Sequence, residues 1–378
     1  MTDASPLLLG PIDLRGHRAR NRVVIPPMCQ YSARDGFPTE WHRQHLSRLA
    51  CGGPGIVFVE ATAIEPRGRI THGDLGIWSD DRAASLAVLA SVIRAQGALA
   101  AIQIGHAGRK ASTQRPWHGN GPIGGPEDQS RGEEPWEIVG PTDAPADAGW
   151  NRPRALGTAE VPAIVEGFAV AAKRADAAGF DVLEIHGAHG YLIHSFLSPL
   201  SNKRNDAYGG DLKGRMRLAL EVTEAVRAVW PAAKPLFFRI SAVDHVEGGW
   251  SIEDSVELAR ALRARGVDAI DCSSGGISGP VTTVPRAPGF QVPFARRVRE
   301  GAGIVTEAVG LILDGLQAEA ILREGSADLI GVAREALYDP FWTLHAARDL
   351  GADPDFAAWP EQYGWWLNRR ARSLAPKR

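Results

Sequence analysis

Short apolar runs that alternate with helix-like stretches constrain the fold of this chain more than any other feature. The runs occupy residues 22–27, 55–60, 99–104, 180–186, 235–241, 267–273, 303–309 and 327–333. Between them lie helical patterns, several of which end on a glycine suited to a helix C′ position: 80–97, 163–179, 214–230, 252–266 and 316–325. Continuously apolar strands are typical of parallel sheets buried on both faces. Eight strand-helix units therefore predict an α/β protein of the (β/α)8 or TIM-barrel class, with a doubly wound open sheet as the second architecture.

Three segments lie outside this alternation. Residues 107–157 follow the third run and are rich in Gly, Pro, Trp and charged residues, so we expect a long capping loop over the carboxyl end of the barrel. The segment before residue 22 is expected to form an N-terminal hairpin that closes the opposite end. Residues 359–378 are expected to form a C-terminal tail. None of the three resembles a separate domain, so residues 1–378 are predicted to form a single domain.

Charge balance and cysteine content restrict the partners and the compartment. Lys and Arg total 42 against 44 Asp and Glu, a formal net charge of −2, so neither nucleic acid nor a membrane is expected as a partner. Cys29, Cys51 and Cys272 are odd in number, lie far apart and form no CxxC motif, which favours a reducing compartment. The sequence has no signal-peptide pattern and no run of the ~20 apolar residues that span a membrane, so we expect a cytoplasmic protein.

Polar residues at the ends of the predicted strands mark the expected functional face, because catalytic groups of barrels gather at the strand carboxyl ends. Gln103 and Arg239 end the third and fifth runs and would suit a bound heterocycle with carbonyls and ring nitrogens; an internal salt bridge is the alternative for Arg239. Val309, Gly310 and Arg334 follow the last two runs, where barrels commonly bind phosphate. A glycine turn and a surface arginine are the alternative there, and a phosphate-bearing ligand is favoured.

The segment GNGPIG at 119–124 matches the GxGxxG pattern of dinucleotide-binding folds. It follows no strand, opens no helix and contains Pro122, so we interpret it as a loop. Nicotinamide chemistry in this chain would therefore not use a Rossmann domain.

The segment HGAHGY at 186–191 directly follows the fourth run and allows three interpretations. Gly187 and Gly190 free the backbone to turn, which would bring His186 and His189 to one side, with Tyr191 further along. A zinc site would need a further ligand that the motif lacks, and satisfied core histidines are the second alternative. Acid-base chemistry is favoured: two imidazole donors that hold an oxygen, and a phenol that gives a proton.

Two other candidates carry less weight. WHRQH at 41–45 repeats the HxxH spacing on a predicted helix, where surface or packing roles are expected. Cys29 has no obvious base assigned to it, so nucleophilic catalysis by this thiol is not expected.

The strand-end segments together resemble the old yellow enzyme family of flavin-dependent ene-reductases (NADH:flavin oxidoreductase/NADPH dehydrogenase), in particular the bacterial branch with a cysteine after the first strand. The matching segments run in one order from about residue 8 to 368: NRVVIPPMCQYS, VEATAIEPRGRIT, GIWSD, IQIGHAGRK, EIHGAHGYLIHSFLSPLSNKRNDAYGG, DCSSG and GVAREALYDP.

The resemblance implies a barrel that holds FMN. It places Pro27, Met28 and Ala61 along the flavin and Gln103 at its pyrimidine edge, with Arg239 near N1 and O2 and Cys29 tuning the flavin potential. It also places the ribityl phosphate on Gly310, Ala333 and Arg334, beside Val309.

The resemblance further implies a two-step reaction on one site. NADPH or NADH reduces FMN and leaves, and an enone, enal or nitroalkene then takes hydride from N5 while His186 and His189 hold its oxygen and Tyr191 protonates the other carbon. Tyr31 would line the substrate site. Where some relatives place a C-terminal arginine in a neighbouring subunit, this chain has Trp365 and Trp366; a homodimer or homotetramer is implied.

Two other functions remain as alternatives at this point. A metal-dependent barrel hydrolase or lyase would use the HxxH histidines, and a flavin-binding protein would hold the cofactor without turnover. The loop after the sixth strand, VTTVPRAPG with Arg286, departs from relatives that have an aromatic residue there, which leaves the substrate range open.

Overall fold

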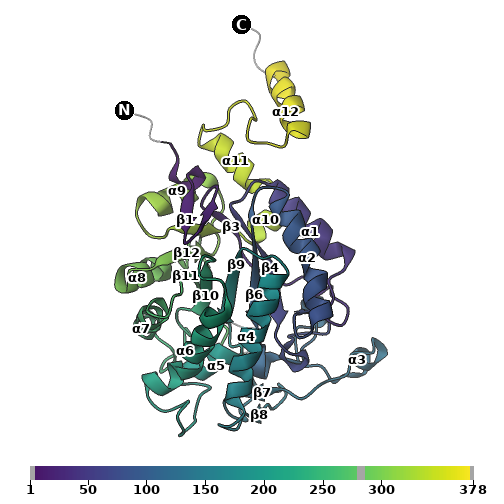
Figure 1. The fold of residues 1–378 in the computed structure, drawn as a ribbon, viewed down its shortest axis with the longest axis vertical. Coiled ribbons are helices and arrows are strands. Elements are labelled where there is room, and N and C mark those ends of the chain that lie inside the picture. The colour runs from purple at the N-terminus through teal and green to yellow at the C-terminus, as the bar shows by residue number, and fades with distance from the viewer. Residues whose placement is uncertain (1–4, 279–285, 375–378) are drawn as a thin grey trace.

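Eight parallel strands close into a barrel in the computed structural model, which describes residues 5–278 and 286–374 (Figure 1). The order β3-β13-β12-β11-β10-β9-β6-β4 is closed by a pairing between β3 and β4. Each predicted run overlaps one barrel strand: β3 (Val23–Ile25), β4 (Ile56–Ala63), β6 (Leu99–Gly105), β9 (Val182–Gly187), β10 (Leu236–Ser241), β11 (Ala269–Ser273), β12 (Val305–Val309) and β13 (Leu329–Gly331). The barrel is confirmed and the open sheet is wrong. A short ninth strand, β5 (Leu75–Gly76), pairs with the end of β4.

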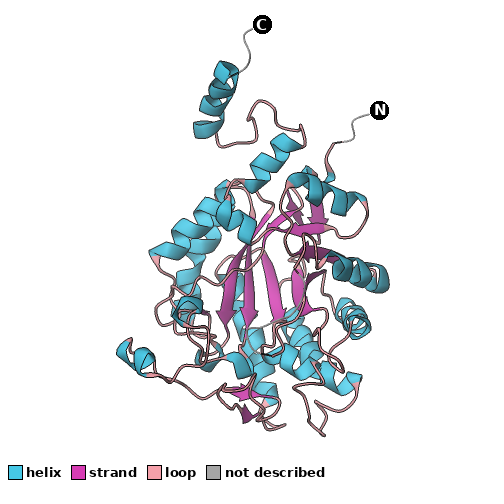
Figure 2. Cartoon of the chain, turned by 180° about the vertical axis from the view of Figure 1, so that it is seen from behind, coloured by secondary structure: helices cyan, strands magenta, loops and turns pink. Residues whose placement is uncertain are grey.

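Helices surround the barrel and bury an apolar stripe against it (Figure 2). Gly179 at C′ of α4 and Gly266, two residues after the C-cap of α7, have φ of +87° and +89°, the left-handed conformation that glycine adopts at helix ends. The helices of this outer layer are α1 (Glu40–Cys51), α2 (Asp80–Arg94), α4 (Val161–Ala177), α6 (Leu212–Val229), α7 (Ile252–Arg263), α8 (Val292–Ala302) and α9 (Gly315–Arg323).

The N-terminal hairpin closes one end of the barrel, as predicted. Strands β1 (Ile12–Leu14) and β2 (His17–Ala19) are antiparallel, after a 3-10 turn, η1 (Leu7–Leu9). Leu14 and Ala19 join one buried apolar cluster with side chains from the barrel strands, among them Val182 and Phe237. The amino ends of the strands are therefore sealed from solvent by apolar packing.

Inside the barrel the side chains change character along β9 and β10. Every second residue of a strand faces the same side, so the residues that follow Val182 inward are Glu184 and His186. On β10 the corresponding inward series after Phe237 consists of Arg239 and Ser241. The barrel interior is thus apolar at the hairpin end, charged in the middle and polar at the carboxyl end.

The segment 107–157 lies at the carboxyl end, opposite the hairpin (Figures 1 and 2). It contains little regular structure: 3-10 turns η3 (Gly108–Lys110) and η4 (Pro116–His118), helix α3 (Pro126–Ser130) and the two-residue strands β7 (Val139–Gly140) and β8 (Arg154–Ala155). Its position agrees with the predicted cap.

The C-terminal region leaves the barrel at the hairpin end. Helices α10 (Arg334–Tyr338) and α11 (Trp342–Asp349) lead to α12 (Glu361–Leu374), which projects away from the barrel in both views (Figures 1 and 2). The predicted tail is therefore helical over most of its length. Within the described residues, no helix has the length and apolar character needed to cross a membrane.

Candidate active site

The carboxyl end of the barrel opens into a cavity of about 420 Å³. Its walls come from the ends of several strands and from the cap, and the residues that matter here are Lys110, His189, Arg239, Gly310, Ala333 and Arg334. A smaller cavity of about 10 Å³ adjoins His186 and Tyr191 and is lined by Ala61 and Asp74. The structure therefore gathers most of the predicted site residues at one mouth.

The turn after β9 brings the two histidines and the tyrosine together. The ring centroids of His186 and His189 lie 5.2 Å apart, and those of His186 and Tyr191 lie 5.0 Å apart. His189 and Gly190 have φ of +60° and +76°, and a Cβ on Gly190 would lie 2.2 Å from the carbonyl oxygen of Gly276. Since that contact is shorter than any real Cβ tolerates, only glycine fits the turn.

Both histidines are neutral at pH 7. Burial, followed by the nearby Arg239 guanidinium, lowers the pKa of each imidazole well below its usual value. Nδ1 of His186 accepts a hydrogen bond from the amide of Ala188 (3.3 Å), which leaves its proton on Nε2. Nε2 of His189 lies 2.7 Å from Oγ of Ser273. The turn thus offers neutral N–H groups rather than cations.

Tyr191, Tyr31 and Cys29 all keep their protons. Burial raises the pKa of both phenols, with the neighbouring Cys29 adding to the effect. Burial also raises the pKa of the Cys29 thiol well above its usual value, which fits the expectation that this thiol is not a nucleophile. A protonated phenol beside two imidazole donors has the chemistry of a proton donor.

The charged layer below the mouth centres on Arg239. Its Nε lies 2.9 Å from Oδ2 of Asp271, so the internal salt bridge considered from the sequence is present, yet Arg239 also lines the cavity. Gln103 donates a hydrogen bond of 2.8 Å to Glu184. Burial, followed by the neighbouring carboxyl of Asp271, raises the pKa of Glu184 and of Glu307 well above the usual value.

The ends of β12 and β13 form the place predicted for phosphate. Gly310 has φ of +119°, and a Cβ there would lie 2.9 Å from Nε2 of Gln291. Val309 and Gly310 share a shallow hollow with Ala333 and Arg334, whose side chain is exposed. Because Gly310 has no Cβ, its backbone lies close to this hollow, and one exposed guanidinium stands beside it. Such a place suits an anionic oxygen group.

The remaining predicted residues lie in two places. Pro27, Met28 and Tyr31 follow β3 at the mouth and are half-buried. Trp365 and Trp366 lie on α12 with exposed fractions of 53% and 65%, at the other end of the barrel from the cavity of their own chain. Arg286 lines the cavity, whereas residues 281–285 of the same loop lie outside the described residues.

The second HxxH pair lies on α1, where Nε2 of His42 is 3.6 Å from Oε2 of the buried Glu60. His42 is buried on α1, and the amide of Thr39 donates to its Nδ1 (3.0 Å). In residues 5–278 and 286–374, no group of three or more His, Cys, Asp or Glu side chains is placed to hold a metal ion.

Sequence reasoning missed the acidic members of the charged layer and Lys110. Glu184, Asp271 and Glu307 are each fully buried, two positions before the end of an apolar run, and that position inside a run was the available signal. Nζ of Lys110 donates to the carbonyl oxygens of His189 (3.0 Å) and Gly276 (2.9 Å). Burial, followed by Arg109, lowers the pKa of Lys110 to about 8.

Neutral imidazoles, protonated phenols and a buried guanidinium at the mouth of a barrel are the surroundings in which a bound cofactor is oriented and its electronics are tuned. The chain belongs to the NADH:flavin oxidoreductase/NADH oxidase family, whose model matches residues 7–353. It is of the old yellow enzyme type, as the sequence segments indicated.

Individual relatives agree with this assignment. An NADPH dehydrogenase of Geobacillus sp. (strain WCH70) is 44% identical over 347 residues, which cover 91% of this chain and 95% of the relative. A structure of morphinone reductase in complex with tetrahydroNAD superimposes with a TM-score of 0.74 at 26% identity, covering 96% of each chain. The old yellow enzyme homologue from Zymomonas mobilis gives a TM-score of 0.72 at 25% identity, covering 89% of this chain and 90% of the other.

Proposed function

We propose that this chain is an FMN-dependent NAD(P)H oxidoreductase that reduces activated C=C bonds of α,β-unsaturated carbonyl compounds or nitroalkenes. The observation that carries the proposal is the convergence of two neutral imidazoles and a protonated phenol on one turn, with the ring of His186 5.2 Å from His189 and 5.0 Å from Tyr191. His186 and Tyr191 line the smaller cavity, and His189 lines the cavity of about 420 Å³. That cavity also reaches a place suited to phosphate. Family membership supports a flavin and a nicotinamide reductant.

The residues present fit FMN. The cavity joins a buried guanidinium at one side, Arg239, to the hollow at Gly310 and Arg334 at the other. Gln103 and Arg239 would meet the polar edge of the isoalloxazine, and Pro27, Met28, Cys29 and Ala61 would line it. The backbone of Val309 and Gly310, with Ala333 and Arg334, would hold the phosphate. When bound, FMN supplies the hydride that the reductant delivers and the acceptor receives.

The side chains of the turn supply the rest of the reaction. N–H groups of His186 and His189 bind the carbonyl or nitro oxygen of the acceptor and stabilise the negative charge that develops there. Tyr191 donates its phenolic proton to the α-carbon, and solvent later returns a proton to the phenolate. Tyr31 borders the same space. Hydride and proton together saturate the C=C bond.

The decisive experiment separates the two halves of the reaction. Purified protein should be yellow, lose its flavin absorption when NADPH is added without oxygen, and regain it when 2-cyclohexenone is added, with cyclohexanone formed. A colourless preparation inhibited by EDTA would favour the metal-dependent hydrolase or lyase. A yellow protein that NADPH does not bleach would be a flavin-binding protein without turnover.

We also propose that the enzyme is a homodimer or homotetramer in the cytoplasm, with Trp365 or Trp366 at a neighbour's mouth. Because α12 projects from the hairpin end, these indoles would reach the cavity at the carboxyl end of a barrel only in another subunit. Sedimentation of the wild type and of the double variant Trp365→Ala, Trp366→Ala tests this. A monomeric wild type with full activity would refute it.

A further inference from the structure

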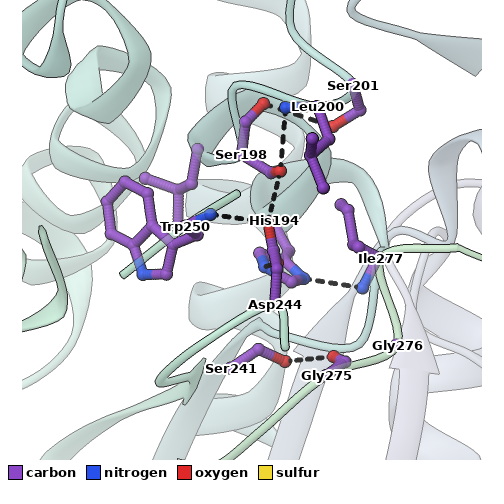
Figure 3. A network of polar contacts seen from close by, with 12 residues as sticks. His194, Ser198, Leu200, Ser201, Ser241, Asp244, Trp250, Gly275, Gly276 and Ile277 are labelled. Atoms are coloured by element: carbon purple, nitrogen blue, oxygen red, sulfur yellow. Dashed lines mark hydrogen bonds and ion pairs between the residues drawn. The ribbon is translucent and has the colours of Figure 1, made fainter. Parts of the chain in front are cut away.

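A buried histidine-carboxylate pair, shown in Figure 3, contacts the turn that follows β9. His194 belongs to the short helix α5 (Leu192–Leu197), and Asp244 follows β10. Nε2 of His194 lies 3.0 Å from Oδ1 of Asp244, and both side chains are 0% exposed. Neither residue lines the cavity, so the pair can act on the reaction only through other groups.

The contact that links the pair to the site is made by the turn itself. The amide of Gly190 donates a hydrogen bond of 2.8 Å to Nδ1 of His194. Gly190 stands between His189 and Tyr191, and its close approach to Gly276 leaves it little room to move. His189 is fixed separately, by Ser241 at its amide (2.9 Å) and by Lys110 at its carbonyl oxygen (3.0 Å).

These contacts determine where His194 carries its proton. Since Nδ1 accepts from the Gly190 amide, it has no proton of its own, and the neutral ring must be protonated on Nε2. Nε2 lies beside the Asp244 carboxylate, 3.0 Å from Oδ1, so its proton is next to a negative charge. An imidazolium, or the opposite tautomer, would set two N–H groups against each other at Gly190.

Asp244 is held as an anion in one orientation. Its Oδ2 accepts hydrogen bonds from Oγ of Ser198 (2.6 Å) and from the amide of Trp250 (2.7 Å), which leaves Oδ1 for His194 (Figure 3). Burial alone would raise the pKa of this carboxyl, but His194, Ser198 and Trp250 together lower it below its usual value. The guanidinium of Arg109 adds a favourable charge from the cap.

We propose that Asp244 and His194 are positioning residues: the carboxylate fixes the imidazole tautomer, and the imidazole holds Gly190 so that Tyr191 and His189 face the substrate. The inference rests on the proposed function for its catalytic readout. The tautomer itself can be measured without any turnover.

The substitution Asp244→Asn tests the tautomer directly. Ser198 and Trp250 both donate to one oxygen, so the asparagine carbonyl should take that side and turn its NH2 group toward His194. Nε2 must then accept, the proton moves to Nδ1, and the bond from Gly190 is lost. Two-dimensional 15N–1H spectra of the holoenzyme with labelled histidine should show Nε2–H in the wild type and Nδ1–H in the variant.

The catalytic readouts follow from displacement of the turn. 4-Chlorophenol serves as a probe whose oxygen would bind His186 and His189 in place of the substrate oxygen, and it should bind Asp244→Asn more weakly. Enone-driven reoxidation should slow on the order of 10- to 100-fold, as expected for small misplacement of a reacting group. Flavin reduction by NADPH should fall less, so the ratio of the two rates changes. An unchanged tautomer, or two half-reactions that fall equally, would overturn the proposal.

Two further variants keep the test valid if Asp244→Asn folds poorly. His194→Asn places an amide oxygen where Nδ1 accepts the Gly190 bond and should retain more reoxidation activity than His194→Ala; equal loss would contradict the positioning role. The matched control is Asp339→Asn, in an exposed pair whose Asp339 Oδ2 lies 2.6 Å from Nδ1 of His345. It should leave phenol binding and both half-reactions unchanged. If the wild-type protein shows the Nε2–H tautomer of His194 but no enone turnover, the proposed function is wrong, whereas the claim that Asp244 fixes the tautomer of His194 is supported.

Discussion

The two ends of the barrel are built from the same strands and have opposite chemistry. On β10, Phe237 packs in the apolar cluster beneath the hairpin, whereas Ser241 binds the amide of His189 at the mouth. On β9 the same change runs from Val182 to His186. A step of four residues along either strand, on the same face, thus separates apolar packing from the candidate site. We therefore expect substitutions at the amino end to change stability and substitutions at the mouth to change reactivity.

The largest expected effect lies at the mouth. Tyr191→Phe removes the proposed proton donor, so enone-driven reoxidation should slow about 10²- to 10⁴-fold, while flavin reduction by NADPH and the unfolding midpoint stay nearly unchanged. Stopped-flow measurement of each half-reaction checks this. If both half-reactions slow equally, Tyr191 is not the proton donor.

A substitution at the amino end of the barrel should lower stability and leave activity nearly unchanged. Phe237 is 0% exposed, so Phe237→Ala leaves a cavity and should lower the free energy of unfolding by about 3–5 kcal/mol, with both half-reactions of the folded enzyme retained. Urea unfolding measures the loss. Leu316→Ala, at a side chain that is 61% exposed, serves as the control and should change little. A large loss of turnover in folded Phe237→Ala would break the separation of the two ends.

At the edge of the mouth, Arg334→Gln should weaken FMN binding to apoenzyme about 10- to 100-fold, because a hydrogen bond to a charged group contributes about 1.5–3 kcal/mol. Riboflavin, which lacks the phosphate, should bind both proteins equally well. Fluorescence quenching on titration measures both affinities. Equal weakening of FMN and riboflavin binding would show that Arg334 does not bind the phosphate.

The smallest effect concerns pH and stability. The pKa of buried His186 is lowered in the folded state, so below pH 6.5 the unfolded chain binds a proton that the folded chain does not. Stability must then fall as pH falls through 6.5, toward the lowered folded pKa, by up to about 1.4 kcal/mol per pH unit. Comparison of urea unfolding between pH 5 and 7 should show a shallower slope in His186→Gln. An identical slope would contradict the neutral assignment.

Much of the fold could be predicted because its signals are local. Strands buried on both faces appear as apolar runs, and the glycines after the helices mark their ends. The gathering of His186, His189 and Tyr191 followed from two flexible glycines at a strand end. Roles of these residues in turnover stay predictions until the half-reactions are measured.

The rest depended on contacts between distant residues. A charged residue inside an apolar run does not identify its partner. The charged layer around Arg239 could be recognised only in the structure, where β9 and β11 flank β10 and β12 lies next to β11. The His194–Asp244 pair joins positions far apart in the sequence, from two different βα loops. The projection of α12 likewise depends on packing that no local pattern encodes.

The hairpin seal has a consequence for the traffic of small molecules. In the described residues the amino end of the barrel is closed by apolar packing and the cavity lies at the carboxyl end, so under the proposed function the spent reductant leaves by the route through which the acceptor arrives. The reductant and the acceptor then compete for the same cavity, and an excess of either should slow the binding of the other. The buried leucine and phenylalanine side chains at the amino end, far from the reacting atoms, would in this way require the reductant to leave before the acceptor binds.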